Sequence, residues 1–451
     1  MLGRKNIDAT KGPILRLIIL YCIPLIIGTL IQTLFNAVDV AILGNMADST
    51  SVASVGATTA IFHLLVHGFV GIASGLKILL ARYIGAQDSK RILDSVGTSL
   101  IFSLVFGIII AVLGFFLSPV FLNLTKCPAD CYDGAVLYLQ IYLTSAPAIL
   151  LYNFGSSVIT ANGDTQRPLY YMLSGGVLNL VLNIILCLIL PQKVVAVAVA
   201  TAASQVFSAF LTIKRVFKLY DLNLKNIPFS FTSLSAMLRF GIPLAITNTL
   251  YPLANLQIQS AINSFGSAAV AGSSAATNLE GIASAFTSSF ATATSVFISQ
   301  NIGANLPDRV KKSFFHNLWL GIASCLVVGG VLYLTGEFWL SILLGSDSAE
   351  AVEFGMIRLF FVTLMYFIAA ANGALGNAIQ AFGYPIVSSI SSIFCILVFR
   401  IIWMNFIYPA FPNFYCLNAC FTVSRILLLL CNIVFATIFF KRYLKGKYKH
   451  L

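Results

Sequence analysis

Long apolar runs, separated by short polar or Pro/Gly-containing breaks, fill most of this chain. A helix needs about 20 apolar residues to cross a bilayer, and each run reaches that length. The pattern therefore predicts twelve spans in two sets of six. The first set lies near residues 13–44, 51–84, 89–122, 132–160, 168–190 and 194–219, and the second near 234–264, 267–302, 309–344, 350–380, 385–410 and 414–441.

A polar segment, DLNLKNIPFSFTS, interrupts the apolar pattern after residue 220. We therefore expect an amino-terminal bundle over residues 1–219, a cytoplasmic linker over 220–233, and a carboxy-terminal bundle over 234–451 that ends in a basic tail. The first apolar run exceeds the length of a signal sequence and is followed by no small-residue cleavage site. We expect it to be retained.

Three short motifs recur in the same order at a spacing of about 219 residues. CIPL at 22–25 echoes GIPL at 241–244, RYIGA at 82–86 echoes QNIGA at 300–304, and Gly163 before Pro168 echoes Gly383 before Pro385. Each repeat holds an even number of spans, so the two halves enter the membrane in the same orientation. This predicts an all-α integral membrane protein with a parallel pseudo-twofold repeat, a plan typical of secondary transporters that work by alternating access.

Composition agrees with membrane insertion. The 451 residues are 59% hydrophobic and 9% charged, with a mean hydropathy of +0.92. These values exclude an ordinary soluble globular protein.

Charge predicts orientation. The formal net charge is +12, and cationic residues crowd both termini and alternate loops. By the positive-inside rule we expect a multi-pass protein of the cell membrane with both termini cytoplasmic. Topology explains the excess of positive charge, so we expect no nucleic-acid partner.

Motifs for other classes of protein are missing from the sequence. There is no GxxxxGK[ST] loop for ATP, no HEXXH metalloprotease motif and no GxSxG nucleophile motif. We expect neither an enzyme nor a resident cofactor.

The ordered motifs make the chain resemble the multidrug and toxic compound extrusion (MATE) family. They comprise a proline-containing first helix with Asp39, Ile84-Gly85-Ala86 and its copy Ile302-Gly303-Ala304, GDTQRP at 163–168, and Arg400-Ile401-Ile402-Trp403. The resemblance covers nearly the whole chain. It implies a transporter of bacterial type that exports small organic compounds, often cationic or amphipathic, in exchange for sodium ions or protons. One chain holds both bundles, so a monomer would suffice.

The resemblance also implies a coupling-ion site in the amino-terminal bundle. The matching positions here are Asp39, Tyr138, Asn179, Asn183 and Thr201. The family pattern has a second acid where this chain has Asn183. Two close carboxylates can raise one another's pKa and hold a proton, whereas one carboxylate among neutral oxygens suits sodium. Burial can also raise the pKa of a single Asp, so both ions stay open, with sodium slightly favoured.

An acid within a membrane span is a candidate functional residue in its own right. Asp39 lies in the apolar run LFNAVDVAILGN, and its alternative role is that of a polar residue near a helix end. Glu280 lies near the middle of its predicted span. It is a second-bundle substrate or proton site together with Arg400, or the partner of Arg400 or Arg425 in an ion pair that holds helices together.

Other features carry less information. His63 and His67 share a helix face and are more typical of packing than of a proton relay. Cys127/Cys131 and Cys416/Cys420 are spaced alike near predicted external helix ends but lack the further ligands of a zinc site. A lipid-linked precursor flippase is the alternative transport function. It would require a cationic cavity, and the first half offers few deep cations beyond Lys77.

Overall fold

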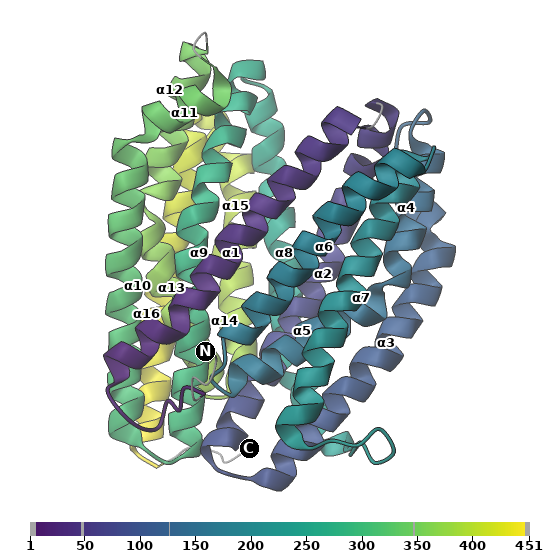
Figure 1. Cartoon of the computed structure of the whole chain (residues 1–451). Helices are drawn as coiled ribbons and strands as arrows, with labels where there is room; N and C mark the ends of the chain where they lie inside the picture. Colours follow the sequence, from purple (N-terminus) through teal and green to yellow (C-terminus); the bar gives the residue numbers. More distant parts are fainter. Residues whose placement is uncertain (1–5, 47–48, 126, 346–347, 447–451) are drawn as a thin grey trace. The chain divides into compact units, whose positions relative to one another are not determined.

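A computed structural model of the chain consists of helices and connecting loops throughout the part that it describes (Figure 1). The described residues are 6–46, 49–125, 127–345 and 348–446, without the side chains at 36–41, 43–46, 49, 60, 63, 251, 253, 254 and 256.

The long helices follow the apolar runs closely. The helices of the first half are α1 (Ile14–Met46), α2 (Ser49–Gly85), α3 (Ser89–Leu124), α4 (Tyr132–Thr144), α5 (Ala146–Ala161), α6 (Gln166–Ile189) and α7 (Lys193–Tyr220). Those of the second half are α8 (Phe231–Asn263), α9 (Ser267–Gly303), α10 (Pro307–Leu334), α11 (Gly336–Leu344), α12 (Ala349–Arg358), α13 (Tyr366–Ala381), α14 (Pro385–Ser392), α15 (Phe399–Ile402) and α16 (Phe414–Leu444). Three π-helical segments and one 3-10 turn interrupt the second half: η1 (Leu359–Thr363), η2 (Ile393–Val398), η3 (Trp403–Ile407) and η4 (Tyr408–Ala410).

Ten stretches of the described chain are long and apolar enough to span a membrane. The bent pair α4 and α5 makes an eleventh span, and the 33-residue α8 completes the twelve long helical segments. The prediction of an all-α membrane protein is confirmed.

Besides the spans over 350–380 and 385–410, which contain the π-helical segments, two further predicted spans are not continuous α-helices. The span over 132–160 bends by 47° between α4 and α5, where Pro147 occupies the first turn of α5 and cannot donate a backbone hydrogen bond. The span over 309–344 ends at Leu334, and α11 follows as a separate short helix.

The helices group into two compact units. The first unit holds Met1–Ile7, Ile27–Ile84 and Asp88–Gly241, and the second holds Asp8–Ile26, Gly85–Gln87 and Ile242–Leu451. The division into bundles over 1–219 and 234–451, joined by a linker over 220–233, stays a prediction.

The internal repeat is visible in backbone geometry as well as in sequence. Gln87 and Asn305, which follow the two copies of Ile-Gly-Ala, both have a φ of 55°. Gly163 and Gly383 also match, with φ of 85° and 91°. Left-handed backbone at a non-glycine residue is uncommon, so its recurrence at matching positions supports the repeat.

Small residues set the helix spacing inside each unit, as is usual where lipid replaces water around a bundle. In the second unit α9 and α12 approach closely at Gly272, where a Cβ atom would lie 2.1 Å from the backbone oxygen of Ala351. A side chain at this position would force the two helices apart.

We therefore expect Gly272→Ala to lower the stability of the protein in detergent by about 1–3 kcal/mol, the usual effect of overpacking. Gly330→Ala on α10 is the matched control, because nothing lies within 4 Å of its Cβ position and alanine favours a helix by about 1 kcal/mol over glycine. Thermal unfolding of the two purified variants checks this, and equal melting temperatures would contradict the close approach.

Candidate functional site

Three of the predicted ion-site residues lie together in the first unit. The Asn183 side-chain amide donates to Oδ1 of Asn179 at 3.1 Å, and the Asn179 amide donates to Oγ1 of Thr201 at 3.4 Å. Asn179 is 7% exposed and Asn183 is 1% exposed. We refer to these three residues as the Asn–Thr row. It joins α6 to α7 through neutral oxygen and nitrogen atoms.

Local sequence explains why the row forms. Asn179 and Asn183 are four residues apart and so share one face of α6. Glycine at position 175 lets α7 approach that helix, since a Cβ atom there would lie 1.9 Å from Oγ of Ser208. Hydrogen-bond partners are scarce within a membrane span, so the amides bond to one another and to Thr201.

The packing of α1 against α6 fixes the level of Asp39 along the helix axis. The Cβ position of Gly28 faces Leu169, and the Cβ position of Gly176 faces the ring of Phe35. The step from Gly28 to Phe35 on α1 and the step from Leu169 to Gly176 on α6 are both seven residues long. The two helices therefore run in the same direction. Four residues further on, Asp39 on α1 is level with position 180 on α6, next to Asn179. The side chain of Asp39 itself lies outside the described residues.

Tyr138 is buried on α4 at 8% exposure. Its ring is stacked on that of Tyr142, with centroids 6.4 Å apart and planes 4° from parallel. A role for Tyr138 in holding the ion stays a prediction.

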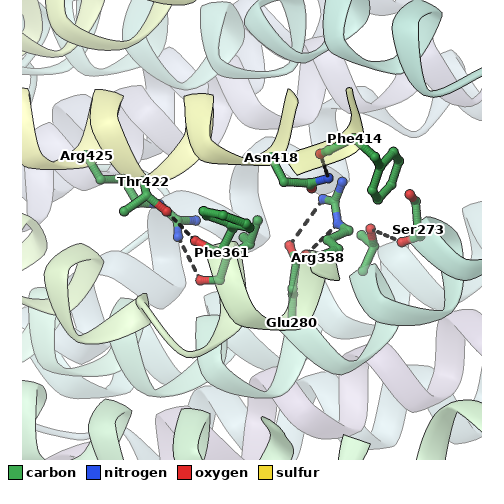
Figure 2. Close-up of polar contacts among 10 residues, drawn as sticks. Ser273, Glu280, Arg358, Phe361, Phe414, Asn418, Thr422 and Arg425 are labelled. Atoms are coloured by element: carbon green, nitrogen blue, oxygen red, sulfur yellow. Dashed lines mark hydrogen bonds and ion pairs between the residues drawn. The ribbon is translucent and has the colours of Figure 1, made fainter. Parts of the chain in front are cut away.

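The second unit contains a buried ion pair that sequence reasoning did not identify. Nε of Arg358 lies 2.6 Å from Oε1 of Glu280, and its second nitrogen lies 3.4 Å from Oε2, so the contact is bidentate (Figure 2). The side chains are 10% and 9% exposed. Where Glu280 forms an ion pair, the sequence predicts Arg400 or Arg425 as its partner. The partner is Arg358, which lies at the end of α12 beside α9.

Arg400 and Arg425 lie in the same unit and make hydrogen bonds to neutral groups. Arg400 is 4% exposed and donates to Oδ1 of Asn255 at 2.6 Å and to Oγ of Ser424 at 3.2 Å. Arg425 donates to the backbone oxygen of Val362 at 3.0 Å. We refer to Arg358, Arg400 and Arg425 as the arginine cluster.

Aromatic rings complete the arginine cluster. The guanidinium carbons of Arg358 and Arg400 lie 5.2 Å and 4.6 Å from the centroid of Phe421. That of Arg425 lies 4.6 Å from the centroid of Tyr366. Such contacts stabilise a cation where water is scarce.

The histidines and cysteines show no metal site in the described part of the chain, which contains no group of three or more metal-ligating side chains. Sγ of Cys127 and Sγ of Cys131 are 3.7 Å apart. His67 is exposed, and the side chain of His63 lies outside the described residues.

Twelve long helical segments, of which ten or eleven are apolar enough to span a membrane, together with an internal parallel repeat and buried polar groups at mid-span, define a multi-pass membrane transporter. The MatE family model matches residues 24–185 and 243–406. The chain belongs to the MatE family, whose members are transporters and not enzymes, as the sequence predicted.

Curated relatives and solved structures agree with this family. The chain is 27% identical to "Probable multidrug resistance protein YoeA" of Bacillus subtilis, over 86% of this chain and 85% of the relative. It is 23% identical to the "FAD transporter" of Shewanella oneidensis, over 86% of each. Among solved structures, an outward-facing multidrug resistance MATE transporter of the MOP superfamily shares the fold. Its TM-score is 0.88 at 22% identity, over 99% of this chain and 100% of that one.

The buried pair of Glu280 and Arg358 predicts a characteristic pattern of stabilities. Arg358→Met leaves a carboxylate buried without its cation, and we expect it to destabilise the protein by about 3–5 kcal/mol. Adding Glu280→Gln removes that charge, so we expect the double variant to recover most of the loss. Thermal unfolding in detergent measures both.

The exposed pair of Asp88 and Arg91 is the control for that comparison, with side chains 36% and 56% exposed. We expect Arg91→Met to change stability by less than about 1 kcal/mol. A double variant no more stable than Arg358→Met alone would show that the ion pair is not what holds the two helices.

Proposed function

We propose that this protein exports amphipathic, often cationic, organic compounds across the cell membrane in exchange for sodium ions or protons. The observation that carries the proposal is the Asn–Thr row, a set of hydrogen-bonded polar groups with two buried amides, level with Asp39 in the first unit. Polar groups inside a membrane span are energetically costly, and those that are retained commonly bind an ion or a substrate. The names of the relatives, which include multidrug resistance proteins, support the class of substrate.

The chemistry of the row favours sodium over a proton. Amide and hydroxyl oxygens beside one carboxylate are hard ligands suited to an alkali or alkaline-earth cation. Asn179 and Asn183 do not titrate, so they cannot hold a proton in place of the missing second acid. Asp39 would supply the charge, and Asn179, Asn183, Thr201 and Tyr138 the neutral oxygens.

Transport requires the ion to bind one conformation more tightly than the other. A cation between α1 and α6 would hold these helices in one packing, and its release would permit another. Alternation between an outward-open and an inward-open state then couples inward ion flow to outward flow of the organic compound. The proposal places both termini in the cytoplasm and requires only a monomer.

A lipid-linked precursor flippase is the second candidate. The arginine cluster favours this function, because a lipid-linked pyrophosphate needs cations to bind it. Export of an organic dye by purified protein in vesicles that contain no such lipid distinguishes the two.

Neutralising the carboxylate at position 39 is the first test of the ion site. We expect Asp39→Asn to reduce sodium-driven ethidium efflux from reconstituted vesicles at least about 100-fold, because charge is lost where a cation must bind. Sodium and proton gradients are imposed separately, and membrane level and melting temperature are measured alongside. Full efflux by a folded Asp39→Asn variant would contradict the proposal.

Restoring the second acid tests the choice of ion. We expect Asn183→Asp to shift efflux from sodium towards proton dependence, because two neighbouring carboxylates raise the pKa of one of them. Asn153→Asp on α5 is the matched control, since its amide donates only to the Ile149 backbone oxygen of its own helix. An unchanged ratio of sodium-driven to proton-driven efflux in Asn183→Asp would show that position 183 does not face the ion.

A further inference from the structure

The arginine cluster lies well inside the span of the second unit. Glu280, Arg358 and Arg425 follow the starts of α9, α12 and α16, and Arg400 precedes the end of the stretch over 385–410. Successive spans cross in alternate directions, so these four helix ends lie on one side. At 1.5 Å per residue, all four charged groups lie about 14 to 20 Å from that side, near the middle of a hydrocarbon layer about 30 Å thick.

Three guanidiniums thus share one depth with a single carboxylate. The other acids of the sequence from 242 to 451 are Asp308, Glu337, Asp347, Glu350 and Glu353. Four of them lie within the first two turns of α10, α11 and α12, and Asp347 lies outside the described residues. Glu280 balances Arg358 through the bidentate contact. Among the described residues of the second unit, three guanidiniums and one carboxylate thus lie at this depth, and guanidiniums gathered in this way favour an anion.

The guanidiniums of Arg358 and Arg400 both lie over the ring of Phe421, so an anion is favoured most strongly near this ring. Their guanidinium carbons each lie within 5.2 Å of one ring centroid, so they are no more than about 10 Å apart. Like charges at this separation repel in a low-dielectric interior. An anionic group beside them would relieve the repulsion and accept hydrogen bonds in the planar geometry that Arg offers.

Irregular backbone surrounds the cluster. Arg358 directly precedes η1, and Arg400 lies between η2 and η3. The π-helical turn of η1 leaves backbone oxygens for side chains of α16: Thr422 donates to Phe361, and Arg425 donates to Val362 (Figure 2). Single π-helical turns inside α-helices are frequent at functional sites. All three such segments in the described chain flank these arginines.

One buried polar atom at the cluster has its hydrogen-bonding capacity unused. Asn418 is fully buried one helical turn before Phe421 on α16, and its amide donates to the Phe414 backbone oxygen (Figure 2). Its Oδ1 atom accepts no hydrogen bond within the described structure. Buried polar groups normally find a partner, so this oxygen could accept a hydrogen bond from a donor group of a bound molecule.

We propose that the arginine cluster binds the anionic group, a carboxylate or phosphate, of an amphipathic molecule within the second unit. The claim that the cluster binds a transported compound rests on the proposed export function. The claim that the cluster binds an anionic group does not depend on export. It extends the compounds that this protein handles from cations to amphipathic anions. A lipid headgroup carries the same chemistry, and the experiment separates the two sources.

Two dyes with the same xanthene skeleton and opposite charge test the proposal. Fluorescence anisotropy measures binding of fluorescein, an anion, and of tetramethylrhodamine methyl ester, a cation, to purified protein in phosphatidylcholine nanodiscs. We expect Arg400→Gln and Arg425→Gln each to weaken fluorescein binding about tenfold or more, the loss of a charged hydrogen bond. Binding of the rhodamine ester should change less than about twofold.

Arg442→Gln is the matched control. Arg442 lies on α16 like Arg425 and over an aromatic ring, 5.8 Å from the centroid of Phe439, but it is exposed near the helix end. We expect it to bind both dyes as the wild type does. Equal fluorescein affinity in all four proteins would overturn the proposal.

A displacement experiment on wild-type protein tests the proposal even if a variant fails to fold. Inorganic phosphate should displace fluorescein but not the rhodamine ester, and failure to do so would also overturn the proposal. Displacement by nanodiscs containing phosphatidylglycerol would assign the site to a lipid headgroup, whereas undiminished binding there supports a soluble amphipathic anion. No gradient is used, so loss of ethidium efflux and loss of dye binding report separately on the two proposals.

Discussion

The bilayer interior supplies no hydrogen-bond partners, and this constraint governs every polar feature of the chain. Backbone groups are satisfied within helices, and polar side chains must find partners on neighbouring helices. In the first unit the amides of Asn179 and Asn183 bond to each other and to Thr201. In the second unit Glu280 and Arg358 satisfy each other, and carbonyls of a π-helical turn accept from Thr422 and Arg425.

The two units meet this constraint with different chemical groups. The first unit gathers neutral oxygens at the level of Asp39, an arrangement suited to a small cation. The second gathers guanidiniums with one carboxylate, an arrangement suited to an anion. The turns of the repeat still match at Gln87 and Asn305, so this difference lies in the side chains and in the π-helical turns that flank the arginines of the second half.

The fold was predictable from sequence because a membrane span needs an apolar run of defined length, and such runs are easily read. The positions of Asn179, Asn183 and Thr201 were predictable only through the family resemblance. The partner of Glu280 was missed, since Arg358, Arg400 and Arg425 lie at similar depths and helix rotation decides which one meets the carboxylate. The π-helical turns and the bend before Pro147 depend on packing across helices, which local sequence does not encode.

Direct binding of radioactive sodium to the purified protein tests the central claim, that the row of neutral oxygens beside Asp39 holds the coupling ion. The account predicts saturable sodium binding in wild-type protein that is lost in a folded Asn179→Ala variant. Saturable binding that persists in Asn179→Ala, or no saturable binding in the folded wild type, would contradict it.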